Sequence, residues 1–149
     1  MQSECMTQEE IYEALRKNDK GKPSQTIGNC VFVLEQDEQF RGKIRFNILS
    51  ERDSIVRDVG WPRNGSAITD RDMSYLKLYL EQHYQLNQEK HLRDAIRIVA
   101  GENRFHPIRD YLEGLQWDKT PRIAHALAKY LGAEECRFNY ECLKVFMLG

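Results

Sequence analysis

From residue 69 to residue 148 the apolar residues recur every third or fourth position, and this period limits the fold more than any other feature of the chain. Such spacing gathers apolar side chains on one side of an α-helix, whereas a strand requires alternation. The inward positions are Met73, Leu76, Leu80 and Tyr84 in a first run, and Leu92, Ala95, Ile96 and Val99 in a second. We expect two packed helices here, the first capped by Thr69 or Asp70 and the second starting near Asn87 and ending at Gly101.

Proline and glycine divide the remaining residues into further helices. Pro107 and Pro121 each stand where a first helical residue is expected, because proline lacks an N–H that would be unpaired there anyway. Thr120 is the expected cap of the second of these helices, and Gly132 its expected end. A last helix over 136–148 carries one apolar stripe, formed by Phe138, Cys142, Val145 and Phe146.

The amino-terminal residues predict one more helix and a joint. Thr7 and Glu10 have the three-residue spacing of a capping box, and Ile11 and Leu15 form the apolar face behind it. Residues 18–23 contain a glycine and a proline, which interrupt regular structure. We expect this loop to be a flexible joint, and residues 1–23 to be flexible with it.

Residues 24–36 fit two structures. The apolar run from Cys30 to Leu34 has the composition of a buried strand. Helical spacing fits the same residues, with Ser24 as the N-cap. The residues by themselves leave both interpretations open.

Residues 44–48 alternate between apolar and polar side chains, which is the period of a half-buried strand. Residues 54–59 are the expected partner strand, across a polar turn at 50–53. An isolated hairpin is marginal in water, so it should pack on the helices. The sequence therefore predicts a mainly α fold, with a single multi-helix domain over 1–149 and one small antiparallel β-hairpin around 43–59.

Composition and charge narrow the classes of function. The net charge of −1 gives no global basic field, so any contact with nucleic acid needs a local patch. No apolar run approaches the roughly 20 residues that span a bilayer, and the first residues lack the apolar core of a signal peptide. We expect a cytoplasmic protein with no membrane partner. The four cysteines form no C-x-x-C pair and have no matching histidine spacing, so we expect no metal site.

No motif for catalysis is present in the sequence. The P-loop motif G-x-x-x-x-G-K-[ST], whose backbone and lysine hold nucleotide phosphates, does not occur in the 149 residues. Paired carboxylates and nucleophile–histidine arrangements are also missing. Asp70 and Asp72 are two residues apart and face different directions on a helix, which makes a poor metal clamp. We expect no catalytic residue, no cofactor and no enzyme activity in residues 1–149.

Basic residues form the candidate contacts to DNA phosphates. One pair, Lys20 and Lys22, lies in the predicted joint, and a second pair, Lys43 and Arg45, flanks the first strand. Acidic neighbours make both clusters typical of a solvated surface. As a functional surface they would form one shared phosphate-tracking face, with Phe46 or Trp61 as a stacking plane for an unpaired base. Three further candidates are Arg109, Lys119 and Arg122, among apolar residues such as Trp117 that we expect to be buried.

The most specific signal lies in residues 103–132, which contain NRFHPIRDYL (103–112), LQWDKTPRI (115–123) and YLG (130–132). This string resembles the segment before the ATPase core in the virulence-associated protein E family. These are P-loop proteins of phages and mobile elements, related to phage-type primase–helicases. Shorter stretches that fit the same family are residues 28–29, 34–37, 42–47 and 70–72.

The resemblance implies a role in DNA replication. Members of this family are ATP-dependent motors that act on DNA and are often associated with primase activity. Residues 1–149 would then be an accessory amino-terminal domain that helps DNA engagement, with 103–149 leading into a P-loop core that binds ATP and Mg²⁺. The expected partners are that core and single-stranded DNA. The resemblance also favours a helix, ending near Glu35, over a strand in residues 24–36.

An alternative interpretation needs no DNA contact. The same domain would be a protein–protein module for self-oligomerisation or for docking a primase, and the near-neutral net charge favours it. This alternative predicts an exposed apolar patch on the last helix, around Phe138, Val145 and Phe146.

Overall fold

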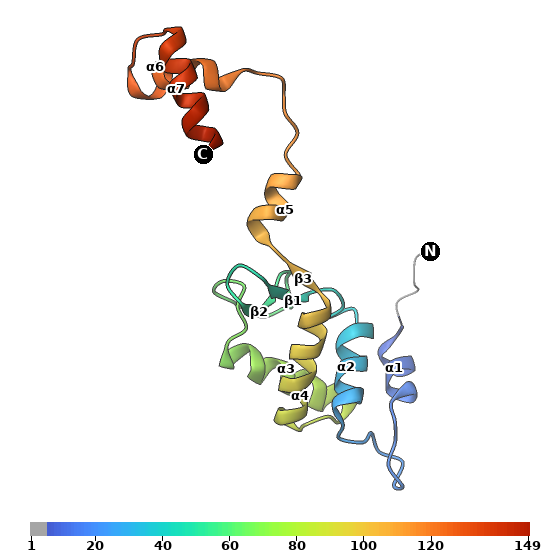
Figure 1. Ribbon diagram of the computed structural model, residues 1–149. Helices are drawn as coiled ribbons and strands as arrows, with labels where there is room; N and C mark the ends of the chain where they lie inside the picture. The colour runs from blue at the N-terminus through green and yellow to red at the C-terminus, as the bar shows by residue number, and fades with distance from the viewer. Residues whose placement is uncertain (1–5) are drawn as a thin grey trace. The chain divides into compact units, whose positions relative to one another are not determined.

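The computed structural model describes residues 6–149 and is mainly helical, with one small sheet (Figure 1). The elements in chain order are α1 (Gln8–Ala14), α2 (Ile27–Gln36), β1 (Ile44–Asn47), β2 (Arg52–Ile55), α3 (Asp70–Tyr84), α4 (Glu89–Glu102), β3 (Arg104–Phe105), α5 (Pro107–Glu113), α6 (Arg122–Leu131) and α7 (Arg137–Leu148). The predicted fold class, mainly α with a small β element, is confirmed.

The chain divides into two compact units, residues 1–112 and 113–149, where the sequence predicts a single domain over 1–149. Burial accounts for this difference. Every fully buried residue of the described chain lies between Ile11 and Ala100. No residue from 113 to 149 is fully buried, although the helices of this segment have the same helical period as those of the first unit.

The core of the first unit is built by α2, α3, α4 and the sheet. Helix α4 packs against both α2 and β1. All eight inward positions predicted for α3 and α4 are buried. The largest fully buried side chains of the unit include Ile11, Leu34, Phe40, Ile44, Leu76 and Tyr84. Each side chain of this size contributes roughly 1.5–3 kcal/mol by leaving water.

The two amino-terminal helices follow their caps. The Thr7–Glu10 capping box is present at the start of α1. Residues 27–36 form a helix, as the family resemblance favours, but its N-cap is Thr26 and not Ser24. The backbone carbonyl of Ser24 instead accepts a hydrogen bond from the Asn29 side chain (2.8 Å), which leaves Thr26 to cap the helix.

Hydrogen bonds close the loop that the sequence predicts as a joint. Lys17 and Pro23 form an antiparallel bridge, and the Ser24 N–H donates to the Arg16 carbonyl at 2.8 Å. Inside the loop, the Asn18 side chain accepts from the backbone N–H groups of Lys20 and Lys22. The backbone of this loop therefore has defined partners at both ends.

The predicted hairpin is present, with a shifted turn. β1 and β2 pair antiparallel, with Ile44 opposite Ile55 and Asn47 opposite Arg52. The turn therefore lies at 48–51 and not at 50–53, and Glu51 takes a left-handed conformation there (φ 53°). A third strand, β3, pairs parallel with β1 and was not predicted. The sheet order is β2-β1-β3.

A buried carboxylate joins α2 to α3. Asp37, the C-cap of α2, accepts hydrogen bonds from the hydroxyls of Tyr84 (2.6 Å) and Tyr79 (3.0 Å). Its other oxygen accepts from the Gln39 backbone N–H at 2.8 Å. Burial raises the pKa of Tyr79 to about 12, and the Asp37 carboxylate adds to the rise. Burial raises the pKa of Tyr84 as well, so both phenols stay protonated donors to Asp37 at neutral pH.

The second unit consists mainly of α6 and α7, which pack on each other. Helix α6 begins at Arg122, with Pro121 and not Thr120 at the N-cap, and Gly132 ends it in the expected left-handed conformation (φ 67°). Trp117 is 74% exposed, so its predicted burial is wrong. Across residues 6–149, no helix combines the length and the apolar character needed to cross a membrane.

Candidate nucleic-acid interface

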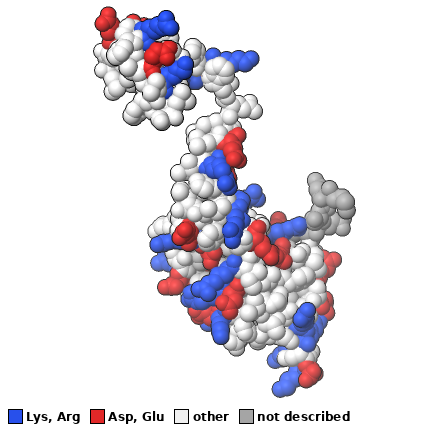
Figure 2. Space-filling view, in the orientation of Figure 1, with Lys and Arg blue, Asp and Glu red and all other residues white. Residues whose placement is uncertain are grey.

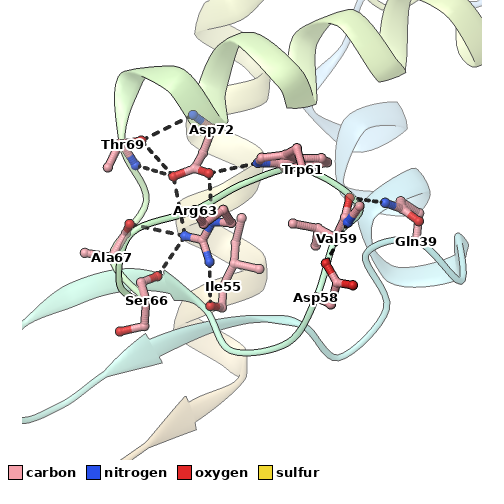
Figure 3. Close-up of polar contacts among 11 residues, drawn as sticks. Gln39, Ile55, Asp58, Val59, Trp61, Arg63, Ser66, Ala67, Thr69 and Asp72 are labelled. Atoms are coloured by element: carbon pink, nitrogen blue, oxygen red, sulfur yellow. Dashed lines mark hydrogen bonds and ion pairs between the residues drawn. The ribbon is translucent and has the colours of Figure 1, made fainter.

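A network around Asp72 fixes the loop between the hairpin and α3 (Figure 3). Arg63 donates to Asp72 through Nε at 2.7 Å, in an ion pair whose side chains are 12% and 4% exposed. The Trp61 indole N–H donates to the same carboxylate at 2.9 Å, and the Thr69 hydroxyl at 2.8 Å. The Arg63 guanidinium also donates to the backbone carbonyls of Ile55, Ser66 and Ala67.

This network serves the structure of the loop. Burial favours the neutral acid, but hydrogen bonds from Arg63, Trp61 and Thr69 outweigh it and hold the pKa of Asp72 well below its usual range. Asp70 is 99% exposed, so the two carboxylates face apart, as the helical spacing predicts. All three guanidinium nitrogens of Arg63 therefore donate to groups of the chain itself.

The sheet presents one polar side, which we call the outer sheet face. Ile44, Phe46 and Ile55 belong to the core or pack against it, so the alternate residues of the strands lie on the other side. Lys43 extends β1 by one residue, because its carbonyl accepts from the Val56 N–H at 2.9 Å. The exposed and half-exposed residues of the outer sheet face are Lys43, Arg45, Asn47, Arg52 and Phe105, whereas Ser54, opposite Arg45, is buried.

The charges of the outer sheet face have one sign. Arg52 is exposed, and the other four residues are half-exposed. Lys43, Arg45 and Arg52 form no ion pair with any residue from 6 to 149. Unpaired cations on a sheet are suited to phosphate oxygens, which is the sequence-independent part of nucleic-acid binding.

An arginine and an aromatic ring pack together on this face. The Arg45 guanidinium carbon lies 4.9 Å from the centroid of the Phe105 ring, within the range of a cation–π contact. One of its nitrogens donates to the Arg104 carbonyl at 3.0 Å, which ties β1 to β3. On the core side, Arg104 lies 5.7 Å from the Phe46 ring. The cation and the ring on the outer face therefore hold each other in place.

The predicted stacking residues have other contacts. Phe46 packs against the core, and Trp61 stacks on Tyr75 with ring centroids 5.3 Å apart while its N–H is bound by Asp72. Neither Phe46 nor Trp61 therefore lies on the outer sheet face. The aromatic residue on the same face as the predicted cations Lys43 and Arg45 is Phe105.

The two basic clusters do not form one shared face. Lys20 and Lys22 lie in the loop before α2, and Figure 1 shows this loop at the opposite end of α2 from the sheet. The expectation of a single phosphate-tracking surface is therefore wrong. Figure 2 shows basic and acidic side chains interleaved over the drawn face of the first unit, so no extended basic surface covers that face.

The remaining candidates lie on elements other than the sheet. Arg109 lies on α5, and its backbone N–H donates to His106 Nδ1 at 3.1 Å. Lys119 and Arg122 belong to the second unit. The Arg122 guanidinium makes two hydrogen bonds to Asp118 (2.7 and 2.5 Å) and holds the pKa of that carboxyl below its usual range. Arg122 is thus already engaged by a carboxylate, whereas Lys119 is exposed.

Three residues of the outer sheet face were missed by sequence reasoning: Asn47, Arg52 and Phe105. A hairpin with its turn at 48–51 would have placed Asn47 and Arg52 opposite each other, so strand alternation carried part of the signal. Phe105 reaches the face only through β3, which has two residues and no period to detect.

No protein-family model matches the chain, and no curated protein matches it. The likeness to the virulence-associated protein E family therefore stays a prediction from residues 103–132. Among residues 6–149 the structure holds no cluster of three or more His, Cys, Asp or Glu side chains placed to bind a metal ion.

Proposed function

We propose that this chain is an accessory module of a phage-type replication ATPase and that it engages DNA through the outer sheet face. The observation that carries the proposal is the set of three cations, Lys43, Arg45 and Arg52, which lie on one side of a three-stranded sheet and have no ion-pair partner among the described residues. The family resemblance supports the replication setting in the cytoplasm. ATP and Mg²⁺ would be bound by a P-loop core and not by residues 1–149.

Binding through three phosphate contacts should be weak and sensitive to salt. For single-stranded DNA we expect the logarithm of affinity to fall with the logarithm of salt with a slope of about −2. Affinity should then drop roughly 15-fold between about 50 mM and about 200 mM salt. Fluorescence anisotropy of the full chain with labelled DNA, at both salt concentrations, measures this slope.

Charge reversal tests whether the outer sheet face is responsible. The double variant Lys43→Glu/Arg52→Glu should lose most of the affinity at low salt. Lys20→Glu/Lys22→Glu changes the net charge equally at the far end of α2, so it is the matched control and should bind nearly as tightly as the wild type. Equal affinities for both double variants would refute the proposed surface.

A second candidate function, a protein–protein module without DNA contact, is favoured by α7. Phe138, Val145 and Phe146 are 74%, 68% and 80% exposed, as this alternative predicts. Tyr140 and Leu143, on the other side of the helix, are half-buried. Helix α7 is thus apolar on two sides, of which only one is covered within the unit.

For this second candidate we propose a second copy of the chain as the occupant. The stripe runs from Phe138 to Phe146 with Cys142 at its centre, so two antiparallel copies of α7 about a twofold axis would place like stripes against each other. Sedimentation velocity over a range of concentrations should show a dimer that Phe146→Glu disperses. A wild-type monomer at every concentration would reject self-association.

A further inference from the structure

One row of side chains crosses all three strands of the sheet. Asn47 of β1 lies opposite Arg52 of β2 on one side and opposite Phe105 of β3 on the other. Residues in register on the same face have side chains about 5 Å apart at their base, so a cation, an amide and an aromatic ring are neighbours. Arg45, two residues before Asn47 on the same face of β1, places its guanidinium carbon 4.9 Å from the centroid of the Phe105 ring.

Within the described part of the chain, the amide of Asn47 has one side that makes hydrogen bonds and one that does not. Its Oδ1 accepts from the backbone N–H groups of Leu49 (3.0 Å) and Ser50 (3.2 Å), which fixes the side chain over the turn. Its Nδ2 donates to no acceptor within residues 6–149. An oriented NH₂ group beside an aromatic ring can donate to the carbonyl or ring nitrogen at the edge of a nucleobase.

The ring and the guanidinium supply the complementary contact to the face of a base. Bases stack on phenyl rings and on arginine planes, and such stacking tolerates any base because each has a π face. In a duplex the base faces are covered by neighbouring pairs, and only an unpaired base can lie flat on a sheet. The outer sheet face therefore offers an aromatic ring and a guanidinium for the face of a base, an amide for its edge, and cations for the neighbouring phosphates.

We propose that the outer sheet face binds one unstacked base of a single-stranded nucleic acid, on Phe105 and Arg45, with Asn47 at its edge and Lys43 and Arg52 at the flanking phosphates. This inference rests on the proposed function, because it assigns the form of nucleic acid that the same surface takes. It adds that bases, and not phosphates alone, contribute to affinity.

The experiment compares three labelled oligonucleotides of about 12 nucleotides, a length within the range that single-strand binding folds cover. The first is oligo-dT, the second carries abasic sites at every position, and the third is a duplex. Oligo-dT and its abasic form have the same phosphates, so their ratio of affinities reports contacts to bases. We expect the full chain to prefer oligo-dT to the abasic strand by roughly 5- to 100-fold, the range given by stacking one base.

Phe105→Leu keeps an apolar side chain on β3 and removes the π face, so it should lower that ratio severalfold while leaving the salt slope unchanged. Phe138→Leu makes the same change on α7 and serves as the control, with an unaltered ratio. The melting temperature of each variant, measured by circular dichroism, establishes that it is folded.

The outcomes separate the two proposals. Equal affinity of the wild type for oligo-dT and the abasic strand, with a salt-dependent slope, overturns the base contact and leaves phosphate binding in place. No binding of either strand at low salt overturns both. A ratio that stays high in Phe105→Leu also overturns the assignment, because the base would then lie elsewhere.

Discussion

Replacing Asp72 with alanine is expected to lower the free energy of unfolding of the first unit by about 3–5 kcal/mol. The carboxylate is 4% exposed and accepts hydrogen bonds from Arg63, Trp61 and Thr69. Its removal leaves the Arg63 guanidinium with a charge that is only 12% exposed and no anion to balance it. The same substitution removes one half of the α3 capping box, in which the Thr69 backbone N–H donates to the Asp72 carboxylate, and leaves the other half, from the N–H of residue 72 to the Thr69 hydroxyl.

The comparison with Asp70→Ala gives this prediction its control. Asp70 lies two residues earlier in the same turn, is 99% exposed, and approaches Arg93 only at 3.8 Å. Its replacement should change stability by less than about 0.5 kcal/mol, as surface substitutions usually do. Urea unfolding followed by circular dichroism measures both, and similar midpoints for the two variants would contradict the buried ion pair.

Phe40→Ala should also destabilise the first unit by about 3–5 kcal/mol, because a fully buried phenyl ring leaves a cavity. Phe40 is 0% exposed. Its ring meets Tyr79 edge-on at 4.9 Å and lies 6.5 Å from Trp61, so the substitution also removes aromatic contacts.

The identical change at Phe138 isolates burial as the cause. That ring is 74% exposed in the second unit, so Phe138→Ala should shift the unfolding midpoint little. The two variants are compared in the same urea titration. If Phe138→Ala cost as much as Phe40→Ala, the ring on α7 would have to be packed in solution.

Helices α1, α3 and α4 of the first unit followed from the sequence because their signals are local, whereas the residues of α2 fitted a strand equally well. The capping boxes at Thr7 and Thr69 and the apolar period of α3 and α4 lie within a few turns of chain. The division into two units did not follow, since an apolar stripe on a helix such as α7 does not specify which surface it meets. The same limit applies to the exposed Trp117.

The candidate site was predicted in part. Lys43 and Arg45 were placed on a strand by alternation alone, and the structure puts both on the outer sheet face. Phe105 could not be predicted from the sequence, because β3 depends on hydrogen bonds to a distant part of the chain. The N–H groups of Phe46 and Ile48 donate to the carbonyls of Asn103 and Phe105, respectively, both at 3.0 Å. No local pattern encodes a pairing of this kind.

The parallel pairing of β3 with β1 has a consequence for the energetics of the first unit. The outer sheet face is formed by two segments that are far apart in the sequence, residues 43–52 and Phe105. The chain between them contains α3 and α4, and the pairing of β3 with β1 brings the ends of this stretch together. A ligand that contacts both segments would stabilise the pairing of β3 with β1. Ligand binding to the outer sheet face should therefore make local unfolding at the end of α4 less frequent, and local unfolding there should weaken ligand binding.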